Sequence, residues 1–464
     1  MWRTQRSEAV GRLQQQFRAQ TGQLLHGGRA ILKGKDGGQT ASEIVLRAGP
    51  CAAAVQVALG DEGFFSQRMD QVVAVQGAGG GEGAVPALLA AKQQALLRRV
   101  ARQLVRDNAH DPPACGKAGI LVLAGGKKPG KTILLRGDMD ALPVQEESGV
   151  DFASEVPGRM HGCGHDMHTA MMLGAAKLLK AHEEELEGTV KLEFQPAEEI
   201  FQGSPDMIAN GLLEDPKVDA AVMFHVLAGM PLPSGMVLVP GGGITMASCE
   251  QYHITVHGKG GHGSMPEACI DPITAAAHIH IALQEINSRE MDPHSFGVFT
   301  TGRFQAGAAS NVIPDTAEMW GTIRTIDPEN KVGELIHKRM TEIAQGVAAA
   351  YRCTAEVGFS DYCPCMVVDH ALAGNAMTYM TELVGQGAMD MSKLTGGKPG
   401  GGSEDFAFVS HEVPTVSMFL SAGNAKEGYA YGQHHPKVKF DDRILYEGSA
   451  AYSWFALRWL SEHK

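Results

Sequence analysis

Short apolar runs alternate with a helical segment in the middle of the chain. Apolar runs at residues 120–123, 132–135, 189–194 and 220–224 predict buried strands, and residues 169–179 predict a helix between the second and third runs. Strands that alternate with helices are typical of a mostly parallel α/β sheet flanked by helices. Ligands of such sheets bind at the carboxyl ends of the strands, so polar residues after these runs are the first candidates for function.

The pattern changes near residue 250, where Tyr252, Ile254 and Val256 alternate with polar residues as in a half-exposed strand. The elements that we expect next are a helix at 272–288, strands at 296–304 and 317–326, a helix at 329–351 and a strand at 354–359. This β-α-β-β-α-β order is that of the ferredoxin-like unit. We therefore expect an inserted second domain at 248–365, which interrupts a first domain made of 1–247 and 366–464.

Residues 1–110 show weaker patterns. Helices are expected near 7–20 and 89–104, and the arginines of the second one form a solvated face. Residues 79–84 fit the G-x-G-x-x-A fingerprint of dinucleotide-binding enzymes. The apolar run at 72–75 is short and no second strand follows promptly, so a flexible glycine linker is favoured over a nicotinamide site.

Charge and composition narrow the function. The net charge of −12 argues against nucleic acid as a partner, because binding to phosphates needs basic patches. No run of 18 apolar residues predicts a membrane span, and the first residues lack the apolar core of a signal peptide, so a cytoplasmic location is expected. Eight cysteines in 464 residues are too few for a disulfide scaffold.

Residues 160–170 carry the strongest chemical signal. Cys163 and His165 flank Gly164, so both side chains can face one metal ion from a loop. A cysteine and a histidine alone would often be core residues, but His161, Asp166 and His168 stand beside them. We predict that Cys163 and His165 are ligands, and that His161 and His168 orient them.

Two adjacent carboxylates, Glu198 and Glu199, follow the predicted strand at 189–194. Neighbouring side chains of a strand point in opposite directions, so one can hold a metal while the other takes a proton from water. An acidic surface loop is the alternative. His225, at the end of another strand, and the pair His434 and His435 are typical of core and surface histidines respectively when considered alone.

Seven motifs occur in an order that closely resembles one family, the metallopeptidases and amidohydrolases that include N-acyl-amino-acid amidohydrolases, hippurate hydrolases and auxin-conjugate hydrolases. The motifs are Leu135-Arg-Gly-Asp-Met-Asp-Ala-Leu-Pro143, His161-Gly-Cys-Gly-His-Asp166, Phe194-Gln-Pro-Ala-Glu-Glu199, Gly258-Lys-Gly-Gly-His262, Asn311-Val-Ile-Pro314, Gly321-Thr-Ile-Arg324 and Gly402-Ser-Glu-Asp-Phe406. The match extends over about residues 117–450.

The resemblance implies two divalent metal ions per subunit, held by Cys163, His165, Glu199, His225 and His434, with Glu198 as general base. His434 is preferred over His435 because of its distance from Lys437. Asp140 and Asp166 would orient ligands, and Asn311 and Arg324 would position the substrate. His262 would polarise the scissile carbonyl from the inserted domain, which in this family commonly acts as a lid and forms a homodimer.

The predicted function is hydrolysis of the amide bond in an N-acyl-amino acid, with Zn, Mn, Co or Ni as the metal. A dipeptidase or metallocarboxypeptidase that uses the same site on small peptides is one alternative. Family members usually open with a helix that carries an Arg-x-x-His-x-x-Pro-Glu type motif, and residues 1–110 do not contain it. A binding protein that holds metal but is catalytically impaired is therefore a third possibility.

Overall fold

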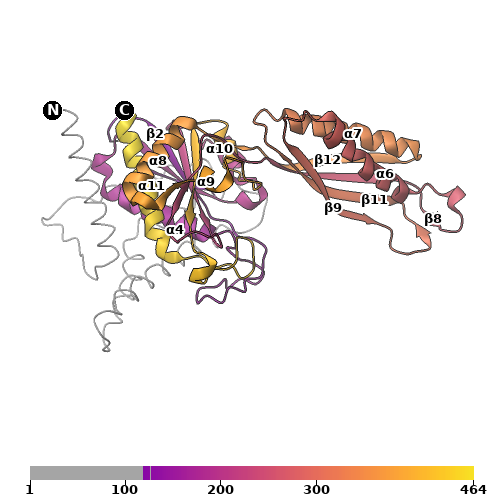
Figure 1. The fold of residues 1–464 in the computed structure, drawn as a ribbon, viewed down its shortest axis with the longest axis horizontal. Coiled ribbons are helices and arrows are strands. Elements are labelled where there is room, and N and C mark those ends of the chain that lie inside the picture. Colours follow the sequence, from indigo (N-terminus) through magenta and orange to yellow (C-terminus); the bar gives the residue numbers. More distant parts are fainter. Residues whose placement is uncertain (1–118, 126) are drawn as a thin grey trace.

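The computed structural model describes residues 119–125 and 127–464. The elements predicted at 7–20, 72–84 and 89–104 lie outside the described residues. The described chain folds into two units, and Figure 1 shows the one that contains β9, β11 and β12 standing away from the other. Each unit has its own hydrophobic core. None of the described helices is long and apolar enough to cross a membrane.

The larger unit is built on a seven-stranded sheet with the strand order β1-β3-β2-β4-β15-β5-β14. Its strands are β1 (Ile120–Gly125), β2 (Thr132–Asp138), β3 (Thr189–Gln195), β4 (Ala220–Leu227), β5 (Val237–Val239), β14 (Ala388–Asp390) and β15 (Thr415–Ser421). Neighbours pair in parallel except for β1 with β3 and β5 with β15. The mostly parallel α/β sheet predicted from the apolar runs is confirmed.

Helices cover this sheet because parallel strands bury both of their faces. They are α4 (His165–Ala181), α5 (Gly203–Ala209), α8 (His370–Val384), α9 (Ser392–Thr395), α10 (Ala407–Ser410) and α11 (Leu445–Glu462). The helix predicted at 169–179 is α4, which begins four residues earlier, at His165. The sequence pattern did not reveal β5, β14, β15, α8 or α11, which complete the unit.

The four-stranded unit (residues 249–363) follows the predicted order of elements. It contains β7 (Cys249–His257), β8 (Gly261–His262), α6 (Pro272–Glu285), β9 (Gly297–Ala306), β10 (Val312–Ile313), β11 (Thr316–Thr325), α7 (Lys331–Ala350) and β12 (Thr354–Cys363). The main sheet is antiparallel and has the order β12-β7-β11-β9. Helices α6 and α7 pack on the face that presents Tyr252, Ile254 and Val256.

The chain crosses between the two units twice, and hydrogen bonds hold both crossings together. Strand β6 (Gly243–Met246) precedes the first crossing and pairs with β13 (Met366–Val368), which follows the second. Ser248 exchanges backbone and side-chain hydrogen bonds with Thr325, at the end of β11. We call this region, residues 243–249, 324–325 and 363–368, the junction.

One buried charge in the sheet predicts a dependence of stability on pH. Glu193 of β3 is fully buried, and neither carboxylate oxygen has a hydrogen-bond partner among the described residues. Burial raises the pKa of Glu193 from its ordinary 4.5 to about 8, with Arg136 opposing the shift. Folding therefore takes up a proton between these two values, and the free energy of unfolding falls as the pH rises through that window.

We expect Glu193→Gln to be more stable than the wild type by about 2–4 kcal/mol at high pH, because the amide carries no charge to bury. The difference should shrink to within about 1 kcal/mol below the ordinary pKa of glutamate, where the wild-type carboxyl is also neutral. Urea unfolding at several pH values measures both. An equal difference at every pH would contradict the assignment to this ionisation.

Candidate metal centre

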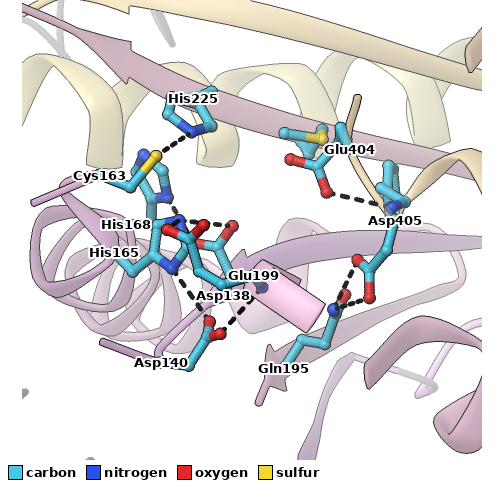
Figure 2. Close-up of polar contacts among 12 residues, drawn as sticks. Asp138, Asp140, Cys163, His165, His168, Gln195, Glu199, His225, Glu404 and Asp405 are labelled. Atoms are coloured by element: carbon cyan, nitrogen blue, oxygen red, sulfur yellow. Dashed lines mark hydrogen bonds and ion pairs between the residues drawn. The ribbon is translucent and has the colours of Figure 1, made fainter. Parts of the chain in front are cut away.

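Most of the predicted metal ligands, and the predicted base, lie where three neighbouring strands end. Asp138 is the last residue of β2, Glu198 and Glu199 follow β3, and His225 lies near the end of β4. Because these strands are parallel neighbours, their carboxyl ends meet at one edge of the sheet. Cys163 in the loop before α4 and His165 at the start of α4 complete this edge, and Figure 2 shows the sulfur of Cys163 directed at the ring of His225.

Gly164 allows the chain to present Cys163 and His165, on either side of it, to the same site. Its φ angle of 91° lies in the left-handed region, and a Cβ atom there would be 2.5 Å from the Cγ2 of Val226. Only glycine fits this position without strain. The resulting turn brings the Cys163 Sγ within 3.3 Å of the His225 Nε2.

All five predicted ligands belong to groups whose potential ligand atoms lie within 4.8 Å of one another. These groups are Cys163–His165–His225, Cys163–Glu199–His434 and His165–Glu198–Glu199. The His165 Nε2 and the Glu199 Oε1 are buried and have no hydrogen-bond partner among the described residues. Buried polar atoms without partners are costly, and a cation would satisfy both. Thiolate, imidazole and carboxylate donors in shared groups fit two divalent transition-metal ions.

Asp140 contacts two of the predicted ligands. Its Oδ1 lies 3.0 Å from the His165 Nδ1, and its Oδ2 accepts a hydrogen bond of 3.0 Å from the Glu199 backbone N–H. The contact with Nδ1 leaves the Nε2 of His165 facing the cluster. A carboxylate that holds the second nitrogen of a ligating histidine fixes its tautomer and its direction.

The electrostatics of the site favour a bound cation. Burial raises the pKa of the Cys163 thiol to about 12 and that of Glu199 to about 7. Burial also raises the pKa of Glu198 well above its ordinary value, and the carboxylates of Glu404 and Asp405 add to the shift. Groups that resist ionisation in this environment become good ligands once a metal ion supplies the compensating positive charge.

The structure adds an acidic network that the sequence interpretation did not assign. Arg136 is buried and binds Asp138 at 2.6 Å, Glu404 at 2.9 Å and Asp405 at 3.1 Å. Asp405 also accepts two hydrogen bonds from the side chain of Gln195. Arg136, a charged residue directly after the apolar run at 132–135 and still within β2, was the sequence signal for this network, because a buried arginine requires carboxylate partners.

This network reaches the predicted base. Glu198, Glu404 and Asp405 each place a carboxylate oxygen within 4.8 Å of the other two. Asp138 continues the network on the other side, where its Oδ1 lies 2.5 Å from the His168 Nδ1. His168 Nε2 in turn accepts a hydrogen bond from the Val226 backbone N–H, so His168 supports β4.

His434, rather than its neighbour, reaches the cluster. The His434 Nε2 lies 3.5 Å from the Glu199 Oε1, whereas the ring of His435 stacks on Tyr431 with centroids 4.2 Å apart. The backbone of His434 has a φ of 65° and donates a hydrogen bond of 2.9 Å to the Gly162 carbonyl. Strained non-glycine backbone of this kind is concentrated at functional sites.

The other predicted site residues lie outside this cluster. His262 and Asn311 are neighbours in the four-stranded unit, where the Gly263 N–H donates to the Asn311 carbonyl. Figure 1 shows β8, which carries His262, at the end of this unit that is remote from the seven-stranded sheet. Arg324 lies at the junction, and Asp166, in the first turn of α4, accepts a hydrogen bond of 3.0 Å from the Met167 N–H.

Comparison with known protein families shows to which family this chain is related. The model of peptidase family M20/M25/M40 matches residues 134–458, which is more than half of the chain. The chain belongs to this family. The resemblance predicted from the seven motifs is therefore confirmed, and the protein is an M20-family enzyme that hydrolyses amide bonds with the help of divalent metal ions.

Several curated relatives match this M20 protein over most of their length. An N-acetylcysteine deacetylase of Bacillus subtilis (strain 168) is 35% identical over 341 residues, 74% of this chain and 85% of the relative. The thermostable carboxypeptidase 2 of Saccharolobus solfataricus is 38% identical, with 72% and 82% covered. The IAA-amino acid hydrolase ILR1-like 4 of Arabidopsis thaliana is 36% identical, with 72% and 74% covered.

A solved M20 structure agrees with the fold. The Bacillus subtilis YXEP protein, described as a dinuclear metal-binding peptidase, superposes with a TM-score of 0.61 at 32% identity. The match covers 79% of this chain and 93% of that one. A two-metal relative with this fold agrees with the ligand groups found at the strand ends.

Proposed function

We propose that the protein releases amino acids from N-acyl-amino acids. The observation that carries the proposal is the cluster of buried thiol, imidazole and carboxylate atoms at the strand ends, together with two relatives named for N-acyl or indole-acetyl amino acids. Cys163, His165, Glu199, His225 and His434 would hold the two metal ions. Bound metals would polarise the scissile carbonyl. They would also lower the pKa of water, so that water could lose a proton and act as a nucleophile at neutral pH.

Glu198 is the proposed general base. It is buried beside the ligands and adjacent to Glu199 in the chain, so it can take the proton of the attacking water and pass it to the leaving amine. The carboxylates of Glu404 and Asp405 lie beside it, each with an oxygen within 4.8 Å of a Glu198 carboxylate oxygen. Burial and the carboxylates of Glu404 and Asp405 raise the pKa of Glu198, so its carboxylate would be a strong proton acceptor once nearby bound cations keep it ionised.

The remaining groups would hold the substrate. Arg324 is the proposed partner of the amino acid's carboxylate, because a guanidinium binds a carboxylate through two parallel hydrogen bonds. Asn311 would contribute a further polar contact. His262 would donate a hydrogen bond to the carbonyl oxygen as negative charge develops there, an interaction made mainly in the transition state.

We further propose that residues 248–365 are a ferredoxin-like lid domain, inserted between 1–247 and 366–464, through which two copies form a homodimer. His262 lies far from the metal centre of its own chain, so a second copy would supply it. Support comes from exposed apolar side chains on this unit, among them Ile281 at 66%, Val312 at 51% and Phe304 at 44%. Strand β9 is an edge of its sheet and can pair with another strand.

A peptidase is the second candidate, because the relatives include a carboxypeptidase at 38% identity. Its substrate would also carry a free carboxylate next to the scissile amide, so the same residues would serve. The proposed location for either activity is the cytoplasm. All six cysteines of the described residues are free thiols, and a thiolate ligand is best preserved in a reducing compartment.

A substrate panel tests the proposal. Protein loaded separately with Zn, Mn, Co and Ni is assayed on N-acetyl amino acids, aromatic acyl amino acids and dipeptides. We expect N-acyl substrates to be favoured at least about tenfold in kcat/KM, and a chelator to abolish turnover until metal is restored. A preference for dipeptides would support the second candidate. No turnover at full metal content would leave a metal-binding protein without this activity.

A further inference from the structure

The side chain of Arg324 is held by a hydrogen bond at the junction. Its Nη1 donates a hydrogen bond of 2.7 Å to the Oγ of Ser403, which belongs to the seven-stranded unit. The Ser403 hydroxyl in turn donates 3.0 Å to the Ala247 carbonyl. A hydroxyl has one hydrogen, so donation to Ala247 leaves a lone pair of Ser403 directed at the guanidinium. Arg324 is thus held in one orientation by a residue outside its own sheet.

The segment that carries Ser403 is itself fixed to the junction. The Ala247 N–H donates to the Gly400 carbonyl at 3.1 Å, and the Gly400 N–H donates to the Thr245 carbonyl at 2.8 Å. Hydrogen bonds therefore hold Ser403 and its segment to the chain that enters β7. The next residue after Ser403 is Glu404 of the acidic network. A side chain in this position can transmit the geometry of one unit to the other.

Ser403 also connects Arg324 with the metal centre. Glu404, the next residue, binds Arg136 and places a carboxylate oxygen within 4.8 Å of Glu198. Arg324 is therefore linked to the acidic network beside the proposed base through two consecutive residues, Ser403 and Glu404. Arg324 also hydrogen-bonds the side chain of Cys249, and its N–H donors that face neither Ser403 nor Cys249 remain for a ligand. A substrate carboxylate held there would be next to a scissile amide that faces Glu198.

We propose that Ser403 is a positioning residue, which aims the Arg324 guanidinium at the carboxylate of the substrate and so gives the enzyme its preference for substrates with a free α-carboxylate. This inference rests on the proposed function. Ser403 does not touch the reacting atoms. Its removal should weaken ground-state binding of the carboxylate and leave the chemical step nearly unchanged, so KM rises with little effect on kcat.

The test compares Ser403→Ala with wild type on an N-acyl-amino acid and on the corresponding carboxamide, which lacks the negative charge. We expect KM for the acid to rise about tenfold, as for loss of a hydrogen bond to a charged group, with kcat within about threefold. The values for the carboxamide should not change. Ser403→Thr keeps the hydroxyl and should restore the wild-type KM. In an Arg324→Ala background, Ser403→Ala should have no further effect on KM.

Ser248→Ala is the matched control, because it removes a buried serine hydroxyl that also forms hydrogen bonds at the junction, to Thr325. It is expected to lower the melting temperature without raising KM for the acid. An unchanged KM in Ser403→Ala, or an equal loss on acid and carboxamide, would overturn the inference. A wild-type enzyme that turns over no N-acyl-amino acid would instead overturn the proposed function.

Discussion

Glu198→Gln should lower kcat on an N-acyl-amino acid by about 10²–10⁴-fold while the protein keeps its metal, because the amide cannot accept the proton of the attacking water. The side chain has almost the same size and stays beside Glu404 and Asp405. Removing the negative charge also relieves repulsion among these buried carboxylates, so stability should be equal or higher. Steady-state kinetics, with metal content measured on the same sample, separate loss of the base from loss of the centre.

Glu193→Gln is the matched control. Glu193 is buried in the strand that leads to Glu198, and Arg136 influences its ionisation as well, but it belongs to none of the ligand groups. The same substitution there should keep kcat within about threefold. If Glu198→Gln retained wild-type turnover, another group would have to be the base. Equal losses in both variants would indicate a general effect of charge removal.

A comparison with Cys163→Ser distinguishes the base from a ligand. Serine is a poor ligand for a transition metal, and Cys163 belongs to two of the candidate ligand groups. Turnover should again fall, but now together with metal content. Full metal content in Cys163→Ser would contradict its assignment as a ligand, whatever the activity.

The sequence predicted the parts of the fold whose pattern is local. β2, β3 and β4 are continuous apolar runs, and residues 249–363 alternate clearly enough to give every main element of the four-stranded unit. β15 is as apolar as these strands but is separated from its partner β4 by the whole four-stranded unit. No local pattern specifies a pairing over such a distance, and the last hundred residues were therefore assigned to the first domain without their elements.

The site residues also divide into those that a local motif predicts and those that a local pattern does not reveal. The sequence alone predicted four of the site residues, because they lie in two short motifs that follow predicted strands. These residues are Cys163, His165, Glu198 and Glu199. His225 and His434 have no informative neighbours, and the family resemblance alone suggested them as ligands. The structure adds what neither source could give, the contact of His434 with Glu199 and the stacking of His435 on Tyr431.

The network around Arg136 was missed for a physical reason. Its carboxylate partners Glu404 and Asp405 lie more than 260 positions away along the chain, in the motif Gly402–Phe406, which carried the family resemblance but was given no role in the site. A charged residue in a buried strand indicates that partners must exist, because an unpaired buried charge is very costly. It does not indicate which of the 52 acidic residues they are. Ser403 belongs to the same motif, and its role was not predicted because that role depends on one contact across the junction, with Arg324.

His262→Ala should also lower kcat by about 10²–10³-fold, as expected when one donor to the developing negative charge is removed. The residue is exposed, and its Nδ1 contacts only Ser264 among the described residues, so the fold should be unaffected. If His262 acts across a dimer, each active site combines Glu198 of one copy with His262 of the other. Two inactive variants then become complementary.

Co-expression of His262→Ala with Glu198→Gln tests this arrangement. A mixed dimer contains one site with both residues intact and one site with neither. Random pairing makes half of the dimers mixed, so about a quarter of the wild-type activity should return. Differently tagged copies allow the mixed dimer to be purified, and it should then have about half the wild-type kcat per dimer. If His262 acted within its own chain, every site in the mixture would lack one residue and no activity would return, because neither variant could repair the other.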